Sequence, residues 1–187
     1  SVKIDEETPG GTYTLFVHEV GNTSVQASAT ITVTGLQDAA EVNGKQYKSL
    51  PRALNAARDG DTVKLLANHV TDADALNALG EDFTFEQYAS IVPVVTKTLT
   101  LDLNHKTVDY LEVGFSETNE ETQKKETLAT GNLTVTGEGA YGRISNLMFM
   151  AGALDIRSGQ IGILVDDNGV ESPDRGLVCD VNSGTAT

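Results

Sequence analysis

Apolar and polar residues alternate along much of this chain, and the alternation predicts strands rather than long helices. Residues 13–20 (YTLFVHEV) alternate, Gly21 and Asn22 follow, and residues 25–34 alternate again. Two runs of period two around a Gly-Asn turn are typical of a β-hairpin. The first part of the chain is therefore predicted to form one hairpin.

A different period occurs over residues 49–57. Leu50, Ala53, Leu54 and Ala57 lie at positions i, i+3, i+4 and i+7, which places them on one face of a helix. Ser49 precedes the run and is a suitable N-cap. Residues 61–66 (DTVKLL) then return to a strand pattern, so one short helix precedes a series of strands.

Those strands share a repeated frame, in which an apolar residue, a polar residue and a second apolar residue lead into a turn. The frame occurs as LDLNH at 101–105, LTVTG at 133–137, LDIRSG at 154–159 and CDVNSG at 179–184. Repeats of roughly 20 to 30 residues that contain one strand each are typical of a solenoid. We therefore predict a parallel β-helix in which each coil adds one strand to a parallel sheet.

The frame also predicts which side chains stack. The expected inward pairs are Leu101/Leu103, Leu133/Val135, Leu154/Ile156 and Cys179/Val181. The expected outward residues are Asp102, Thr134, Asp155 and Asp180, with glycines 137, 159 and 184 at the corners. An open coil end exposes core and sheet edge, so the helix at 49–57 is expected to cap the first coil.

Three segments carry a resemblance to a known family: VNGKQYKSLPRALNAARDGDTVKLLA, KTLTLDLNHKTV and GNLTVTG. Together they resemble the pectate-lyase-like right-handed β-helix modules of Gram-positive surface proteins, over residues 41–187 apart from two insertions. The chain departs from the family pattern at His105-Lys106, where a Gly-His pair is usual. The resemblance implies the fold rather than an activity, because this scaffold carries lyases, hydrolases, adhesins and inert stalks.

The earlier segment, GTYTLFVHE with SATITVTG, resembles the last two strands of a bacterial immunoglobulin-like domain. The predicted fold class is therefore all-β. Residues 1–36 are expected to be the C-terminal strands of a partial immunoglobulin-like domain. Residues 37–187 are expected to be a capped parallel β-helix truncated at its C-terminal end, within a longer protein.

Charge and composition exclude several classes of function. The 187 residues hold 13 Lys and Arg against 27 Asp and Glu, a formal net charge of −14. This charge would repel nucleic acid, and no apolar run approaches the roughly 18 residues of a membrane span. Cys179 is the only cysteine, so no disulfide framework or thiolate metal site is available. We expect a monomer with no cofactor, metal, nucleic-acid partner or membrane insertion.

The outward aspartates are the best candidates for catalysis. Asp155 and Asp180 would lie on neighbouring rungs about 5 Å apart, and paired carboxylates could support glycoside chemistry or hold Ca²⁺ against an acidic sugar. Arg143 and Arg157 are the basic residues available nearby. A solvated outer face is the favoured interpretation, so no catalytic residue is assigned. Asp166, Asp167 and Asn168 resemble a calcium loop only faintly, and a turn is favoured there.

The first insertion, residues 71–95, is the predicted binding surface. Its aromatic residues Phe83, Phe85 and Tyr88 lie among acidic residues, as hot-spot anchors lie within a polar rim. The rim residues are Glu81, Asp82 and Glu86. A short helix is expected over residues 74–79, capped by Asp72 or Asp74. The alternative is that the three rings only cover the flank of the coil.

The second insertion, residues 116–130, is polar, and a mobile loop is expected there. Together these features predict a non-enzymatic binding module, located extracellularly on a bacterial cell surface. The expected partner is a host glycoprotein such as an immunoglobulin or mucin, or a glycan. The alternatives are a polysaccharide lyase or hydrolase that uses the aspartates, and a passive stalk.

Overall fold

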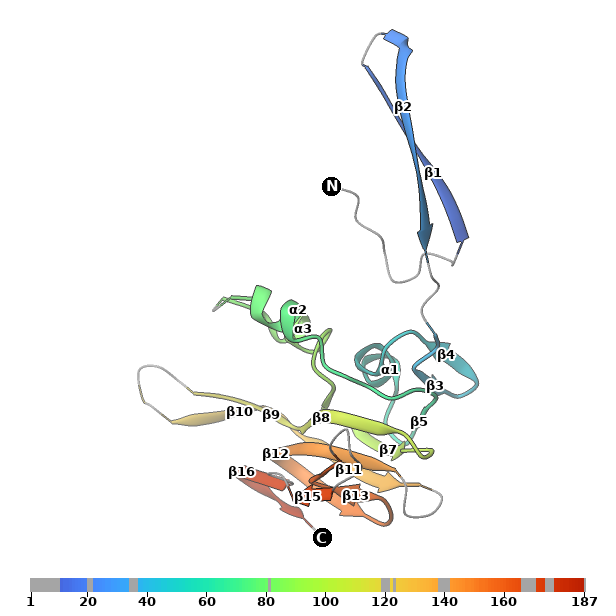
Figure 1. The fold of residues 1–187 in the computed structure, drawn as a ribbon. Coiled ribbons are helices and arrows are strands. Elements are labelled where there is room, and N and C mark those ends of the chain that lie inside the picture. The colour runs from blue at the N-terminus through green and yellow to red at the C-terminus, as the bar shows by residue number, and fades with distance from the viewer. Residues whose placement is uncertain are drawn as a thin grey trace. The chain divides into compact units, whose positions relative to one another are not determined.

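The chain divides into two compact units, residues 1–37 and 38–187. The structure is a computed structural model (Figure 1). It describes residues 11–19, 22–33, 37–80, 82–118, 122, 124–137, 142–165, 171–173 and 177–186.

The first unit contains a long antiparallel hairpin. Strand β1 (Gly11–Glu19) pairs with β2 (Asn22–Val33), with Tyr13 opposite Ile31. The hairpin predicted from the alternation is therefore confirmed. Phe16 is 70 % exposed and Val17 is 69 % exposed, so large apolar side chains lie on its surface. Membership of an immunoglobulin-like domain stays a prediction.

The second unit is built mainly from strands. Its elements are β3 (Ala40–Val42), β4 (Lys45–Tyr47), α1 (Leu50–Ala56), β5 (Thr62–Leu65), α2 (Ala73–Ala78), α3 (Phe85–Tyr88), β6 (Val94–Val95), β7 (Thr98–Asp102), β8 (Thr107–Val113), β9 (Phe115–Thr118), β10 (Lys125–Ala129), β11 (Gly131–Thr136), β12 (Arg143–Ile156), β13 (Gln160–Ile161), β14 (Ile163–Val165), β15 (Glu171–Pro173) and β16 (Leu177–Ala186). Helices take only short parts of the described chain, so the predicted all-β class is confirmed.

Helix α1 is the helix that the sequence predicts at 49–57. The Ser49 hydroxyl accepts a hydrogen bond from the Arg52 backbone N–H at 3.4 Å. At the other end the Lys97 ammonium donates to the carbonyls of Asn55 and Ala57, both at 2.7 Å. A cation at a helix C-terminus satisfies carbonyls that have no partner within the helix. Both ends of this short helix are therefore held.

One large sheet contains most of the strands of the second unit. Its order is β4-β3-β5-β7-β11-β12-β8-β6, and β13 and β16 also pair with β12. From β5 onward the pairs in this sheet are parallel, whereas β3 pairs with β4 and β5 in the antiparallel sense. Figure 1 shows β7, β11, β12 and β8 as neighbouring ribbons in the second unit.

Strand β12 pairs with different partners along its length. Residues 143–149 lie beside β8, and residues 152–156 lie beside β11. A register shift between Phe149 and Ala151 in the pairing with β16 marks the bend between these parts. Gly152 lies just beyond it with φ of +124°, and a Cβ there would lie 1.8 Å from the Gly131 carbonyl oxygen. Only glycine fits this close approach of two chain segments.

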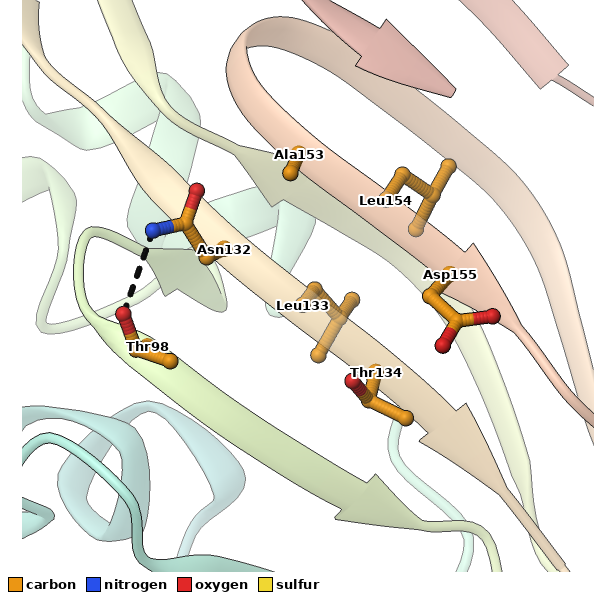
Figure 2. Close-up of a pocket in the computed structure, with 7 residues that line it drawn as sticks. All are labelled: Thr98, Asn132, Leu133, Thr134, Ala153, Leu154 and Asp155. Carbon is orange, nitrogen blue, oxygen red and sulfur yellow. Dashed lines mark hydrogen bonds between the residues drawn. The ribbon is translucent and has the colours of Figure 1, made fainter. Parts of the chain in front are cut away.

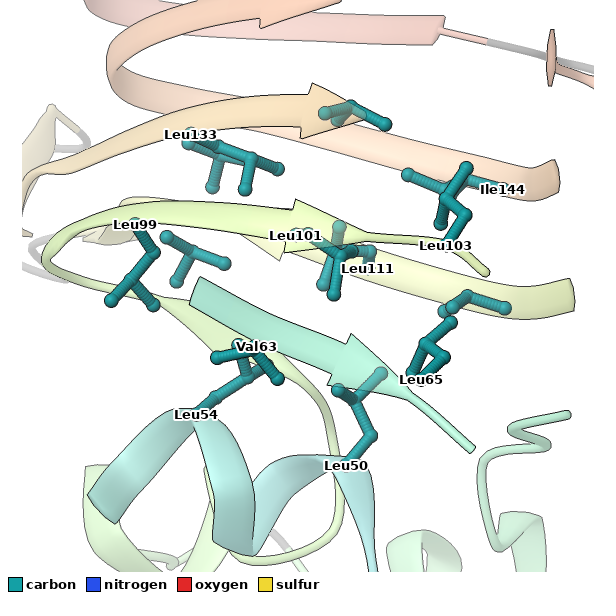
Figure 3. Close-up of a cluster of buried hydrophobic side chains, with 14 of the residues drawn as sticks. Leu50, Leu54, Val63, Leu65, Leu99, Leu101, Leu103, Leu111, Leu133 and Ile144 are labelled. Atoms are coloured by element: carbon teal, nitrogen blue, oxygen red, sulfur yellow. The ribbon is translucent and has the colours of Figure 1, made fainter. Parts of the chain in front are cut away.

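The main core fills the space between α1 and the parallel strands. Figure 3 shows Leu50 and Leu54 of α1 beneath Val63, with the leucines of β7 and β11 beyond. All belong to one cluster of buried side chains. The helix therefore covers one end of the strand stack, as expected of a cap.

The predicted stacking of the repeats is correct in part. Leu133 lies opposite Leu154 as expected, but Leu133 also lies opposite Leu99, so Leu101 is paired with Val135. A shift of two residues keeps the same face buried. The pattern of apolar and polar residues therefore does not distinguish the observed register from the predicted one. Cys179 lies opposite Phe149 rather than Leu154, because β16 continues past the bend of β12.

The second insertion has more regular structure than expected. Strands β9 and β10 form an antiparallel hairpin, with Ser116 opposite Thr127 and Glu117 opposite Glu126. Strands therefore occupy part of the segment 116–130, and its mobility stays a prediction. Thr118 of β9 and Thr127 of β10 favour strand structure through their branched Cβ atoms, although the segment as a whole is polar.

Candidate ligand-binding site

The first insertion folds into two short capped helices. The Asp72 carboxylate accepts a hydrogen bond from the Ala75 backbone N–H at 2.9 Å, so α2 begins one residue before the predicted start. Helix α3 has a capping box, in which the Thr84 hydroxyl and the Gln87 side chain each accept from the backbone N–H of the other residue. These caps fix where each helix begins.

A second, smaller core joins α3 to the sheet. Its buried members are Ala89, Val92, Val94 and Phe115, and its partly buried members are Leu76, Phe85, Tyr88, Tyr110 and Ala129. The Phe85 and Phe115 ring centroids lie 4.8 Å apart, and those of Tyr88 and Phe115 lie 5.7 Å apart. The Asn55 side-chain amide also donates to the Ala89 carbonyl at 2.9 Å, which connects the insertion to α1.

Beneath α3 lies a buried acidic residue, Glu112 of β8. Its side chain is 2 % exposed. The hydroxyls of Tyr88 and Tyr110 both donate to its Oε1, at 2.7 and 2.6 Å. Its other oxygen, Oε2, is buried and has no hydrogen-bond partner among the described residues. A buried acceptor without a partner costs free energy, so this oxygen is an unusual feature of the fold.

The ionisation of this group of side chains is perturbed. Burial raises the pKa of the Glu112 carboxyl, although the two tyrosine hydroxyls oppose the shift by stabilising the charged form. Burial and the neighbouring carboxyl of Glu112 raise the pKa values of Tyr88 and Tyr110. Both tyrosines therefore remain neutral hydrogen-bond donors to Glu112.

A cavity of about 510 Å³ opens beside Glu112. We call it the Glu112 cavity. The lining residues are Asp82, Phe83, Tyr88, Glu112, Phe115, Ser116, Glu117, Thr118 and Met150. Its walls therefore combine three aromatic rings with three acidic side chains, and none of these lining residues is basic. The Ser116 hydroxyl is also buried and has no partner within the described part of the chain.

The predicted binding residues fall into different environments. Asp82, Phe83 and Tyr88 line the Glu112 cavity, and the Phe83 and Tyr88 rings stack at 5.5 Å. Phe85 packs against Phe115 in the smaller core instead. Glu86 is exposed in the first turn of α3 and does not line the cavity.

Glu81 lies outside the described residues. Phe85 covers the flank of the sheet, as the alternative interpretation expects, whereas Phe83 borders the cavity and Tyr88 does both. Binding through these rings stays a prediction.

Sequence reasoning missed the centre of this site. Glu112 is an acidic residue inside the run YLEVGF, between Leu111 and Val113, and both neighbours are fully buried. A charged residue within an otherwise apolar strand was the available signal. The TFEQ capping box at 84–87 was a second signal, because it marks the start of a helix.

The outer face of β7, β11 and β12 has a separate, smaller hollow of about 120 Å³ (Figure 2). The lining residues are Thr98, Asn132, Leu133, Thr134, Ala153, Leu154 and Asp155. The Asn132 side-chain amide donates to the Thr98 hydroxyl at 3.1 Å. Polar side chains of three neighbouring strands therefore share this face.

The predicted row of aspartates does not form on this face. Asp155 lies opposite Thr134, and Thr134 lies opposite Thr100. Asp102 lies opposite Thr136, one step further along the strands. The two-residue shift of β7 separates the two carboxylates, and Asp155 instead forms an ion pair with Arg157 at 2.8 Å.

The predicted contact between Asp155 and Asp180 also fails, because β16 places Ala186 opposite Leu154. The candidate calcium loop at Asp166, Asp167 and Asn168 lies outside the described residues. Within the described chain no three His, Cys, Asp or Glu side chains gather to hold a metal ion.

No helix in the described parts of the chain has the length and apolar character needed to cross a membrane. No family model, curated protein or solved structure matches this sequence.

Proposed function

We propose that residues 38–187 form a capped, right-handed parallel β-helix of the pectate-lyase-like type. Two parallel ladders support this fold. One ladder runs through Val63, Leu101, Val135 and Ile156. The other joins β6, β8 and β12 and runs through Val95, Val113 and Phe149. A chain that returns to each ladder in turn, always in the same direction, winds as a coil.

The same residues are proposed to act as a non-enzymatic binding module of an extracellular bacterial surface protein. The observation that carries this proposal is the Glu112 cavity, where an unpartnered buried carboxylate oxygen lies beside aromatic rings. Binding sites typically combine apolar walls with a few polar groups that fix the ligand. The insertion that builds this cavity interrupts the coil, and insertions in solenoids often form the binding face.

The partner is proposed to be a host macromolecule with a basic surface. Asp82 and Glu117 border the cavity together with Glu112, and the whole chain carries a net charge of −14. Complementary charge speeds association and gives specificity, and salt screens it. A host glycoprotein with a basic patch, such as an immunoglobulin, fits this description better than a neutral glycan or an acidic mucin.

Binding to purified host macromolecules tests this function. The full chain is immobilised, and immunoglobulin, mucin and a neutral glycan are passed over it at low and high salt. We expect the immunoglobulin to bind, more weakly at high salt, and the acidic mucin to bind less well. Phe83→Ala is expected to weaken binding about tenfold, the loss typical of an interface anchor.

The control is Phe16→Ala, which removes another exposed phenylalanine in the first unit. Equal affinity of the Phe83→Ala variant and the original chain would contradict the proposed site. Absence of binding to all three macromolecules would contradict the proposed partner class.

A further inference from the structure

The acidic and aromatic walls of the Glu112 cavity indicate the chemistry of its ligand. We infer that this cavity binds an organic cation, namely the ammonium or guanidinium group of a basic side chain on a partner protein. The inference rests on the proposed function and names the group that the partner would insert. It is carried by one unpartnered oxygen, three aromatic rings and the charge of the lining.

The unpartnered oxygen is the first argument. Glu112 Oε1 already accepts hydrogen bonds from Tyr88 and Tyr110, while Oε2 on the same carboxyl has no partner in the described structure. Both tyrosines hold the carboxyl in place, and Glu112 is one of the residues that line the cavity. An N–H group from a cation would satisfy this oxygen, and charge-assisted hydrogen bonds of this kind are about twice as strong as neutral ones.

The aromatic walls are the second argument. Phe83 stacks on Tyr88 with ring centroids 5.5 Å apart, and Tyr88 also contacts Phe115 at 5.7 Å. Aromatic rings attract organic cations through their quadrupoles, and the attraction is larger in sites that exclude water. Rings also pack against the alkyl stem of a lysine or arginine side chain. A neutral sugar would gain the stacking but would leave the excess negative charge uncompensated.

Charge and size are the third argument. Asp82 and Glu117 line the cavity together with Glu112, and Met150 adds an apolar side chain to the lining. At about 510 Å³ the cavity is far larger than a bare metal ion needs, and it lies within the usual range of ligand pockets. A side chain with an extended stem and a charged end therefore matches it in shape and in sign.

The ionisation of Glu112 should be linked to binding. The charged and titratable groups around it are Tyr88 from α3, Tyr110 from β8, Glu117 from β9, and Asp82 before α3. Burial holds the pKa of Glu112 above its ordinary value, whereas a bound cation would favour the charged carboxylate. Binding is therefore expected to release a proton and to strengthen as the pH rises through the range where free Glu112 titrates.

The experiment uses the full chain and small probes in calorimetry. The probes are N-acetyl-lysine methylamide, N-acetyl-arginine methylamide and the neutral norleucine analogue. We expect both cationic probes to bind and norleucine to bind at least about tenfold more weakly. Glu112→Gln, which keeps an acceptor for both tyrosines, should weaken the cationic probes by a similar factor.

Asp82→Asn is a second variant at an exposed position, and it should weaken cation binding without affecting the fold. Glu86→Gln is the matched control, because Glu86 belongs to the same segment but does not line the cavity. Circular dichroism of each variant checks that it folds.

The outcomes separate this inference from the proposed function. Equal binding of norleucine and the cationic probes, or no effect of either Glu112→Gln or Asp82→Asn, would overturn the inference. If a host glycoprotein still bound through Phe83 in that case, the proposed function would stand. If neither the probes nor the glycoproteins bound, both would fail.

Discussion

At the scale of single residues, Glu112 shows how an insertion changes the role of a position. Side chains of a strand point alternately to opposite faces. Leu111 and Val113 belong to the main core, so Glu112 faces the other way. Without α3 this position of the strand would be in solvent. Helix α3 covers it and supplies Tyr88 as a hydrogen-bond donor, so a surface carboxylate has become a buried one.

This burial predicts a pH dependence of stability. Because the pKa of Glu112 is raised in the folded chain, the folded state holds more protons than the unfolded state above the ordinary pKa of a glutamate. The free energy of unfolding therefore falls as the pH rises through this window. Glu112→Gln removes the titrating group, so the free energy of unfolding of the variant should fall less as the pH rises. The variant should therefore become more stable relative to the original chain at higher pH.

Urea titrations of both proteins between about pH 4 and pH 8 measure the effect, since this range covers the ordinary glutamate pKa and values well above it. The difference between the two proteins cancels the contribution of the other acidic groups. Glu86→Gln is the control and should follow the original chain throughout. A constant difference between Glu112→Gln and the original chain at every pH would show that Glu112 titrates as an exposed glutamate does.

At the scale of elements, the residues that cap the short helices could be recognised in the sequence. Ser49 predicted the start of α1. Of the two caps predicted for α2, Asp72 or Asp74, the structure has Asp72, and the helix begins one residue earlier than predicted. The sequence also contains the capping box of α3, Thr84 with Gln87, but the start of this helix was not predicted from it. The register of β7 could not be predicted, because a shift of two residues leaves the pattern of apolar and polar positions unchanged. The row of aspartates failed for that reason.

Helix α1 is predicted to stabilise the second unit as a cap. Leu54 is 2 % exposed within the main core, so Leu54→Ala removes buried methyl groups and leaves a cavity between helix and strands. A loss of about 2–5 kcal/mol in the free energy of unfolding is expected. A reversible denaturant titration measures it. Leu128→Ala is the matched control, because Leu128 is 55 % exposed and should change stability by less than about 0.5 kcal/mol.

At the scale of the whole molecule, the class of fold was predictable and the centre of the candidate site was not. The alternation of residues and the single capped helix indicated an all-β chain, since these signals are local. The Glu112 cavity combines residues from α3, from the neighbouring strands β8 and β9, and from β12, and these three parts lie far apart in the sequence. Only the pairing of β8 with β12 brings Glu112 opposite Met148, near Met150 of the lining. No local pattern contains that information.

The division into two units leads to a prediction for the whole molecule. Strands β1 and β2 pair only with each other within the described residues, and the large sheet lies wholly in the second unit. The main core also contains only residues of the second unit. A fragment of residues 38–187 should therefore keep the unfolding midpoint and the denaturant dependence of the full chain, since both depend on the surface exposed when that core unfolds.

A peptide of residues 1–37 should behave differently. An isolated two-stranded hairpin is at best marginally stable in water, and this hairpin leaves Phe16 and Val17 exposed. We expect the peptide alone to lack a cooperative unfolding transition by circular dichroism. If the fragment of residues 38–187 lost more than about 1 kcal/mol relative to the full chain, a loss typical of removing a native contact, the first unit would have to stabilise the second directly. The two units would then unfold together rather than independently.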